Sequence, residues 1–185
     1  MQVSLVFFDG GGDAMFKRIT LAMVFAVPVA GLPSVPVYAD DPSFVTIGAG
    51  SFDFNRQKDQ GAEFRVDYRT DYKFGIFKPF LTGAVVTNGM TFFGAGILVD
   101  VYFGNRFVVT PSFAPTWWRG KTDGLDLGHG LEFRSQIEFA YRFDDRSRIG
   151  IAVSHSSNAS NADTNPGTES ILLNYSYPLG KFFSR

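Results

Sequence analysis

Residues 131–142, LEFRSQIEFAYR, alternate between two kinds of side chain. One face of this stretch carries mainly leucine, isoleucine, phenylalanine and tyrosine, and the other carries mainly glutamate, glutamine and arginine. A period of two residues predicts a β-strand with one apolar and one polar face. A tilted strand of about 9–11 residues is long enough to cross a lipid bilayer. This stretch therefore raises the question of which face meets water and which meets lipid.

The same alternation recurs throughout the chain after residue 40, and no helical periodicity is found there. We predict eight strands. They cover residues 43–54, 62–70, 76–88, 91–102, 107–118, 131–142, 147–157 and 169–179. Short links (DYKFG, FGNR and FDDR) alternate with longer ones (NRQKDQG, KTDGLDLGHG and ASNADTNPG). These features predict an all-β fold, an eight-stranded antiparallel up-and-down transmembrane β-barrel with short periplasmic turns and longer external loops.

A soluble eight-stranded barrel also has alternating strands, but its lumen is apolar and its outer surface is polar. In this sequence the charged rows at 63–69 and 132–142 combine arginine with acidic residues, a composition that suits a narrow lumen filled by ion pairs. The opposite rows are rich in phenylalanine, valine and isoleucine and carry almost no charge. The pattern alone does not determine which face is outside. The apolar rows and the N-terminal segment described next favour lipid on the outside.

The N-terminal segment, residues 1–39, has the features of a targeting sequence. Two basic residues precede the apolar run 19–39, ITLAMVFAVPVAGLPSVPVYA, and three prolines interrupt that run. A basic start, an apolar stretch and a small residue at the end are typical of a secretory signal peptide, with cleavage expected after Ala39. We expect translation to start at Met15 and residues 40–185 to form the barrel domain. A short N-terminal membrane anchor is the alternative.

The composition excludes several classes of function. The chain has 185 residues, no cysteine and only 2 histidines, which excludes disulfides and thiolate sites and argues against a histidine-rich metal site. Its net charge of −1 provides no basic surface for nucleic acid. The 21 phenylalanines and 20 glycines suit an aromatic lipid-facing wall around a lumen of small residues. We expect no metal and no organic cofactor.

The last two predicted strands place three chemically useful side chains on the apolar row. His155, Ser157 and Glu169 continue this lipid-facing row, where a carboxylate and an imidazole are costly unless they pair. A symmetric hairpin puts Ser157 opposite Glu169 and His155 opposite Ile171, so that Glu169 is a diagonal neighbour of His155.

A serine hydroxyl becomes a useful nucleophile when an adjacent base accepts its proton and a third group orients the base. Ser157, His155 and Glu169 are these three groups in our interpretation. A simpler alternative makes Ser157 an ordinary serine near a loop and His155 an interfacial histidine. His129, between two glycines, is interpreted as a solvated loop residue.

The motif HSSNA at 155–159, followed by NPGTES at 165–170 and a tyrosine-rich last strand, resembles the lipid A 3-O-deacylase family (PagL). The resemblance implies an outer-membrane barrel of a Gram-negative bacterium that hydrolyses the 3-O-linked acyl chain of lipid A (lipopolysaccharide) in the outer leaflet. It implies Ser157 as nucleophile, His155 as base and Glu169 as the orienting carboxylate. It also implies Asn165 as an oxyanion-hole residue, with Asn158 beside it.

No cofactor and no nucleic-acid partner follow from this resemblance, and a homodimer stays open. The alternative is a non-enzymatic small outer-membrane barrel with a structural or adhesion role. That alternative explains the strands equally well but does not explain why three catalytic residue types share the lipid-facing row.

Overall fold

The computed structural model describes residues 41–120, 125–161 and 163–180. The predicted signal peptide and its cleavage site lie outside these ranges. No helix within them is long and apolar enough to cross a membrane. The strands are β1 (Phe44–Phe52), β2 (Gly61–Arg69), β3 (Lys78–Val86), β4 (Thr91–Leu98), β5 (Val101–Phe103), β6 (Phe107–Arg119), β7 (Leu131–Arg142), β8 (Arg148–Ser157) and β9 (Thr168–Pro178).

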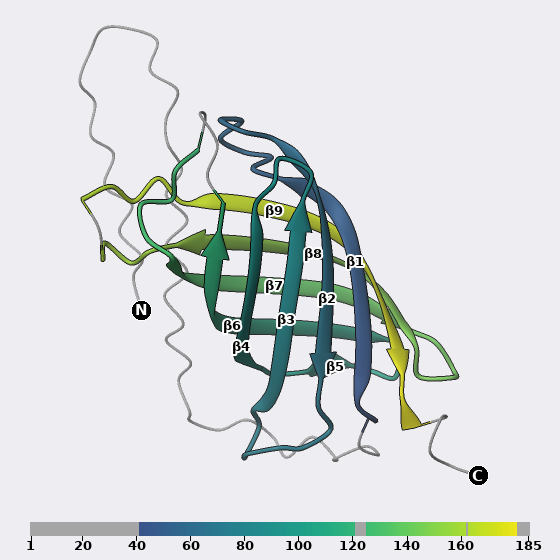
Figure 1. The fold of residues 1–185 in the computed structure, drawn as a ribbon. Helices are drawn as coiled ribbons and strands as arrows, with labels where there is room; N and C mark the ends of the chain where they lie inside the picture. The colour runs from purple at the N-terminus through teal and green to yellow at the C-terminus, as the bar shows by residue number, and fades with distance from the viewer. Residues whose placement is uncertain (1–40, 121–124, 162, 181–185) are drawn as a thin grey trace, which may run out of the picture. The chain divides into compact units, whose positions relative to one another are not determined.

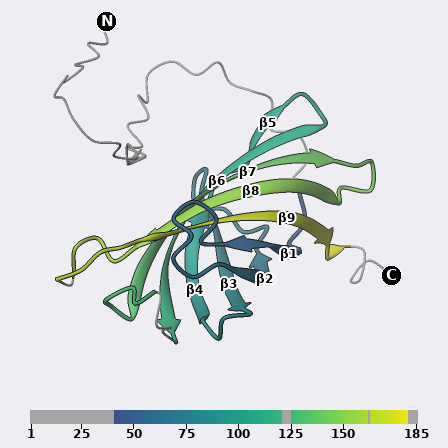
Figure 2. The ribbon, with the colours of Figure 1, turned by 90° about the horizontal axis from the view of Figure 1, so that it is seen from above.

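The strands form one closed antiparallel sheet (Figures 1 and 2). β1 pairs with both β2 and β9, and β4 pairs with β6, which closes the barrel. Strands that follow one another in the chain are neighbours in the sheet, so the connectivity is up-and-down. Closure satisfies the backbone groups that lipid cannot hydrogen-bond. The predicted fold class is confirmed.

The short strand β5 is a continuation of β4, so the barrel has eight strands rather than nine. Both pair with β6 in one register, with Leu98 opposite Ser112 and Val101 opposite Val109. Between them, Val99 N donates to Pro111 O at 3.0 Å. Residues in such a pair normally exchange two hydrogen bonds, but proline has no N–H to return the second one. Pro111 therefore accounts for the local break in the ladder.

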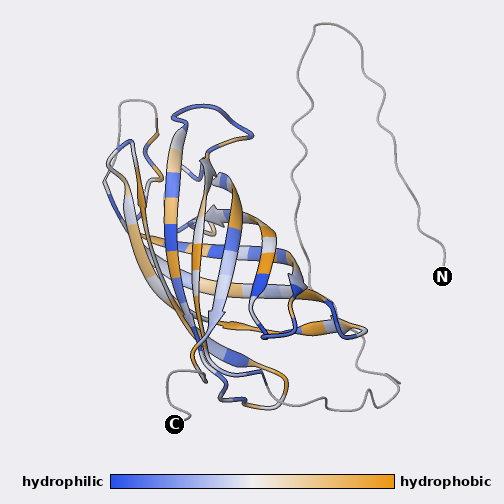
Figure 3. Cartoon of the chain, turned by 90° about the vertical axis from the view of Figure 1, so that its right-hand side faces the viewer, coloured by the Kyte–Doolittle hydropathy of each residue, from blue (hydrophilic) through white to orange (hydrophobic). Residues whose placement is uncertain are grey.

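The polar faces of the strands line the lumen and the apolar faces form the outer wall. On β2, Glu63, Arg65 and Asp67 are buried, whereas Phe64 and Val66 are more than half exposed. Figure 3 shows the resulting alternation of hydrophilic and hydrophobic residues along the strands. This is the arrangement of an outer-membrane barrel, and it is the reverse of the soluble alternative with an apolar lumen.

Side chains fill the lumen from one end to the other. We call the end with the long connections (53–60, 120–130 and 158–167) the loop end, and the opposite end the turn end. An apolar cluster lies towards the loop end; its members are Phe52, Ala84, Val86, Met90, Phe92, Trp118, Leu125 and Leu127. Below it, Arg69 pairs with Glu138 at 2.7 Å. The charged rows thus form the ion-pair network predicted for the lumen.

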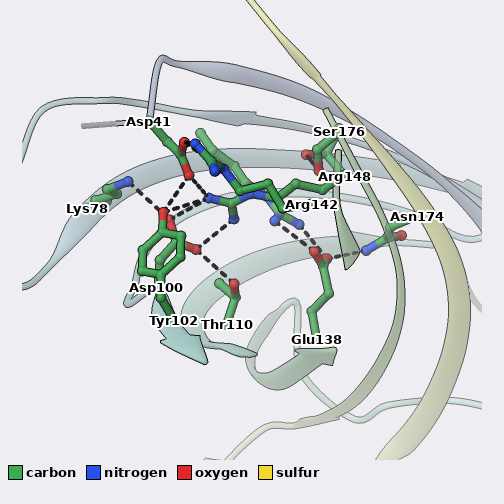
Figure 4. Close-up of polar contacts among 12 residues, drawn as sticks. Asp41, Lys78, Asp100, Tyr102, Thr110, Glu138, Arg142, Arg148, Asn174 and Ser176 are labelled. Carbon is green, nitrogen blue, oxygen red and sulfur yellow. Dashed lines mark hydrogen bonds and ion pairs between the residues drawn. The ribbon is translucent and has the colours of Figure 1, made fainter. Parts of the chain in front are cut away.

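An ionic cluster fills the turn end of the lumen (Figure 4). Arg148 lies at its centre and pairs with Asp41 at 2.5 Å and with Asp100 at 2.9 Å. Arg142 also pairs with Asp41, at 2.8 Å, and Lys78 pairs with Asp100, at 3.0 Å. The cluster joins residues from β3, β7 and β8 to the segment that precedes β1. It therefore ties the start of the described chain to the barrel.

Candidate active site

The β8–β9 hairpin carries the predicted site residues, and its register differs from the symmetric one. His155 lies directly opposite Glu169, and Ser156 lies opposite Thr168. The expectation that Ser157 faces Glu169 and His155 faces Ile171 is therefore wrong by two residues. Glu169 is a direct rather than a diagonal neighbour of His155, which brings the two side chains closer together.

The connection between the two strands explains this difference in register. A shift of two residues leaves every side chain on its original face, so the hydrophobic pattern is the same in both registers. The conformation of the connection determines the register instead. Gly167 adopts φ +60°, in the left-handed region that glycine enters readily, and β9 starts at the next residue.

His155 and Glu169 form a hydrogen-bonded pair on the outer wall. His155 Nδ1 lies 3.0 Å from Glu169 Oε1. The His155 side chain is 40% exposed and that of Glu169 is 15% exposed, so the imidazole is the more accessible member of the pair. When Nδ1 carries the proton and donates it to the carboxylate, the neutral ring has its lone pair on Nε2, where a base needs it.

Ser157 shares the outward face of β8 with His155. It is half-buried and lies opposite Phe133 of β7. In the described part of the chain, no hydrogen bond joins the Ser157 hydroxyl to His155. Hydrogen bonds between nucleophile and base are often formed only once substrate is bound. A second outward-facing serine, Ser135 of β7, lies directly opposite His155.

The two asparagines in the 158–167 connection have different environments. Asn158 is fully buried, and its Nδ2 donates to Leu127 O at 2.9 Å and to Thr164 O at 2.7 Å. Asn165 is exposed, and its Oδ1 accepts a hydrogen bond from Asn158 N at 3.2 Å. The acceptor end of the Asn165 amide is thus occupied while its Nδ2 donor has no described partner. Asn158 holds the connection in place, and Asn165 presents a donor at its surface.

A pocket of about 840 Å³ lies at the loop end, next to Asn165. Three connections line it, through Lys58, Asp126, Gly128, Asp163, Thr164, Asn165 and Pro166. Asn165 therefore lines this pocket and also contacts Asn158, the residue that follows Ser157.

Two residues that contact the start of β9 were not predicted from the sequence: Arg56 contacts Glu169, and Asp53 contacts Thr168. Both lie in or next to the β1–β2 connection, and Arg56 Nε lies 3.4 Å from Glu169 Oε2. More than 100 positions separate Arg56 from Glu169 in the chain, and no local motif links them. His129 is exposed and accepts a hydrogen bond from Leu131 N at 3.0 Å, which agrees with its interpretation as a loop residue. Among the described residues, no cluster of three or more potential ligands could hold a metal ion.

Comparisons with known proteins identify the family of the chain and support its fold. The family model described as "Lipid A 3-O-deacylase (PagL)" matches residues 70–178, which is more than half of the chain. The crystal structure of the outer membrane enzyme PagL is similar, with a TM-score of 0.58 and 17% identity, over 73% of this chain and 99% of that one. No curated protein sequence matches the chain.

Two further solved structures show lower similarity. The outer membrane protein Ail of Yersinia pestis has a TM-score of 0.43 and 11% identity, over 73% of this chain and 99% of that one. Neisserial surface protein A (NspA) has a TM-score of 0.47 and 8% identity, over 72% of this chain and 92% of that one.

Proposed function

The chain belongs to the lipid A 3-O-deacylase (PagL) family of outer-membrane β-barrels, and on this premise we propose that it removes the 3-O-linked acyl chain of lipid A with Ser157, His155 and Glu169. The observation that carries the proposal is the 3.0 Å pairing of His155 Nδ1 with Glu169 Oε1 on the outer wall, next to Ser157. Lipid A lies in the outer leaflet. A triad on the outer wall near the loop end reaches the ester bond without removing the lipid from the membrane.

In the proposed mechanism, His155 Nε2 accepts the Ser157 proton while Ser157 Oγ attacks the ester carbonyl carbon. The C–O bond to the sugar then breaks, and His155 returns the proton to the departing sugar oxygen. Water attacks the acyl-serine, again giving its proton to His155, and the fatty acid leaves as Ser157 recovers its proton. Glu169 stabilises the imidazolium in both steps.

The oxyanion formed in each step requires hydrogen-bond donors. We assign this role to Asn165 Nδ2, because the Asn165 acceptor oxygen is already bonded to Asn158 N. Asn158 takes part through its position: its buried amide secures the connection that carries Asn165. The pocket at the loop end is lined mainly by charged and polar residues, Asn165 among them, which suits the sugar head group of the substrate. No cofactor enters this mechanism.

A non-enzymatic barrel is the rival, and mass spectrometry of lipid A separates the two. Detergent-folded protein is incubated with lipid A, and we expect the loss of one 3-hydroxyacyl chain. Ser157→Ala is expected to abolish this loss. Ser135→Ala is the matched control, because Ser135 also faces outward and lies directly opposite His155 on β7. An unchanged lipid A spectrum with correctly folded wild-type protein would rule out the esterase, and activity that survives in Ser157→Ala would rule out Ser157 as the nucleophile.

A further inference from the structure

Arg56 contacts the proposed triad from outside the hairpin that carries it. Its Nε lies 3.4 Å from Glu169 Oε2, the carboxylate oxygen that His155 does not use. Glu169 Oε2 is buried and accepts no hydrogen bond within the described ranges. Among the described residues, the ion pair with Arg56 therefore stabilises this oxygen.

We propose that Arg56 is a positioning residue that holds the Glu169 carboxylate in the orientation in which its other oxygen receives the His155 proton. A carboxylate that is held by one oxygen alone can rotate about its last carbon–carbon bond. A cation at the second oxygen restricts this rotation and keeps the negative charge favourable at the edge of the lipid phase. The kinetic consequences of this inference rest on the proposed function, but the geometric ones do not.

Hydrogen bonds within the β1–β2 connection hold Arg56 next to Glu169. Asp53 is fully buried at its start, and its Oδ2 accepts hydrogen bonds from Lys58 N at 2.7 Å and from Asp59 N at 2.9 Å. Asp53 Oδ1 accepts a hydrogen bond from the hydroxyl of Thr168, the residue before Glu169, at 3.3 Å. Asp53 thus joins the Arg56 connection directly to the start of β9.

Gly167 leaves space for the side chains of His155 and Arg56. A Cβ atom at this position would lie 3.0 Å from His155 Cε1 and 3.4 Å from Arg56 Nη2. The imidazole and the guanidinium therefore approach the same point on the backbone from two sides. Any side chain at residue 167 would push one of them away.

Kinetics with purified lipid A distinguishes positioning from substrate binding. We expect Arg56→Ala to lower kcat roughly 10- to 100-fold, since small misplacements of catalytic groups have effects of this size, while KM changes less than about threefold. Arg56→Lys should recover part of the loss, and added guanidinium ions should partly rescue Arg56→Ala. Arg119→Ala, which removes an exposed cation at the loop end of β6, is the charge-matched control. A raised KM with unchanged kcat, or wild-type kinetics, would overturn the proposal.

Nuclear magnetic resonance tests the geometry without any substrate. The chain has only 2 histidines, so His129→Asn leaves His155 as the only source of imidazole signals. In this background we expect a downfield Nδ1 proton resonance from the bond to Glu169. It should broaden or vanish in Arg56→Ala, as in Glu169→Ala, and persist in Arg119→Ala.

The two experiments keep the inference separate from the proposed function. If the Nδ1 proton resonance is the same in wild type and Arg56→Ala, the positioning role is overturned, even if the enzyme deacylates lipid A. A resonance that depends on Arg56 in a protein without deacylase activity supports the positioning role, although the proposed function has then failed. Arg56→Gln, which removes the charge but keeps a side chain of similar length, provides the same comparison should Arg56→Ala not fold.

Discussion

At the scale of single residues, Glu169 is held between two partners with different roles. His155 uses one of its oxygens and Arg56 the other. The first contact sets the tautomer of the imidazole, and the second sets the angle of the carboxylate. In the proposed mechanism, these two contacts together orient the partly exposed His155 imidazole as a base.

Replacing Glu169 with glutamine tests what its charge contributes. We expect Glu169→Gln to retain the fold and a weakened contact to His155 but to lose stabilisation of the imidazolium, so that deacylation slows markedly. The loss should be smaller than in Ser157→Ala or His155→Ala, since the orienting carboxylate of such triads is the less critical member. Initial rates of 3-hydroxyacyl release measure the order. Equal losses in all three variants would contradict the assigned roles.

Asn165 and Asn158 should respond differently to truncation. Asn165→Ala removes the exposed donor, and we expect a roughly 10²- to 10³-fold loss in rate with little change in thermal stability. Asn158→Ala serves as the comparison: it removes buried hydrogen bonds to Leu127 O and Thr164 O and should lower the unfolding temperature as well. Wild-type rates in Asn165→Ala would remove this residue from the oxyanion hole.

At the scale of elements, the β8–β9 hairpin shows how far a sequence pattern reaches. The alternation placed both strands and assigned His155, Ser157 and Glu169 to the same outward face. It could not determine the register, because a two-residue shift conserves the faces and only the connection distinguishes the two pairings. The conformation of that connection depends on Asn158 and on contacts with the 120–130 connection, which is distant in the chain.

Gly167→Ala tests the role of this connection. The backbone of the new alanine would have to adopt φ +60°, and its methyl group would lie 3.0 Å from His155 Cε1. The left-handed conformation costs a non-glycine residue about 1–2 kcal/mol, and the contact displaces the base, so we expect lower stability and lower activity together. Thermal unfolding and lipid A turnover measure the two effects. Gly89→Ala, with φ +93° and no atom within 4 Å of its Cβ position, is the control for backbone strain alone.

At the scale of the whole molecule, periodicity predicted the closed barrel because each strand has one face in lipid and one in the lumen. It predicted that charged residues fill the lumen, but not their partners: Arg69 pairs with Glu138, which is 69 positions away. Arg56 escaped prediction for the same reason. Contacts between distant strands and connections follow from closure and register, which no local pattern encodes.

Asp41 connects the start of the described chain to the barrel and should make its stability sensitive to acid. Burial alone would raise the pKa of this carboxyl, but the charge of Arg148 and hydrogen bonds from Tyr102, Arg148 and Arg142 outweigh burial and hold the pKa below its ordinary value of 3.8. Because the folded pKa is lower than the unfolded one, Asp41 stabilises the barrel fully at neutral pH. This contribution should be lost as the pH falls below about 4.

Asp41→Asn separates this group from the other acids of the barrel. We expect the variant to unfold at a lower temperature than wild type at pH 7, because Arg148 and Arg142 lose a charged partner. The difference should shrink as the pH falls below about 4, where wild type loses the same interaction. Asp144→Asn is the control at the same end, since its side chain is 91% exposed and its pair with Arg106 should contribute little. A constant gap between wild type and Asp41→Asn across this range would show that Asp41 acts through its shape rather than its charge.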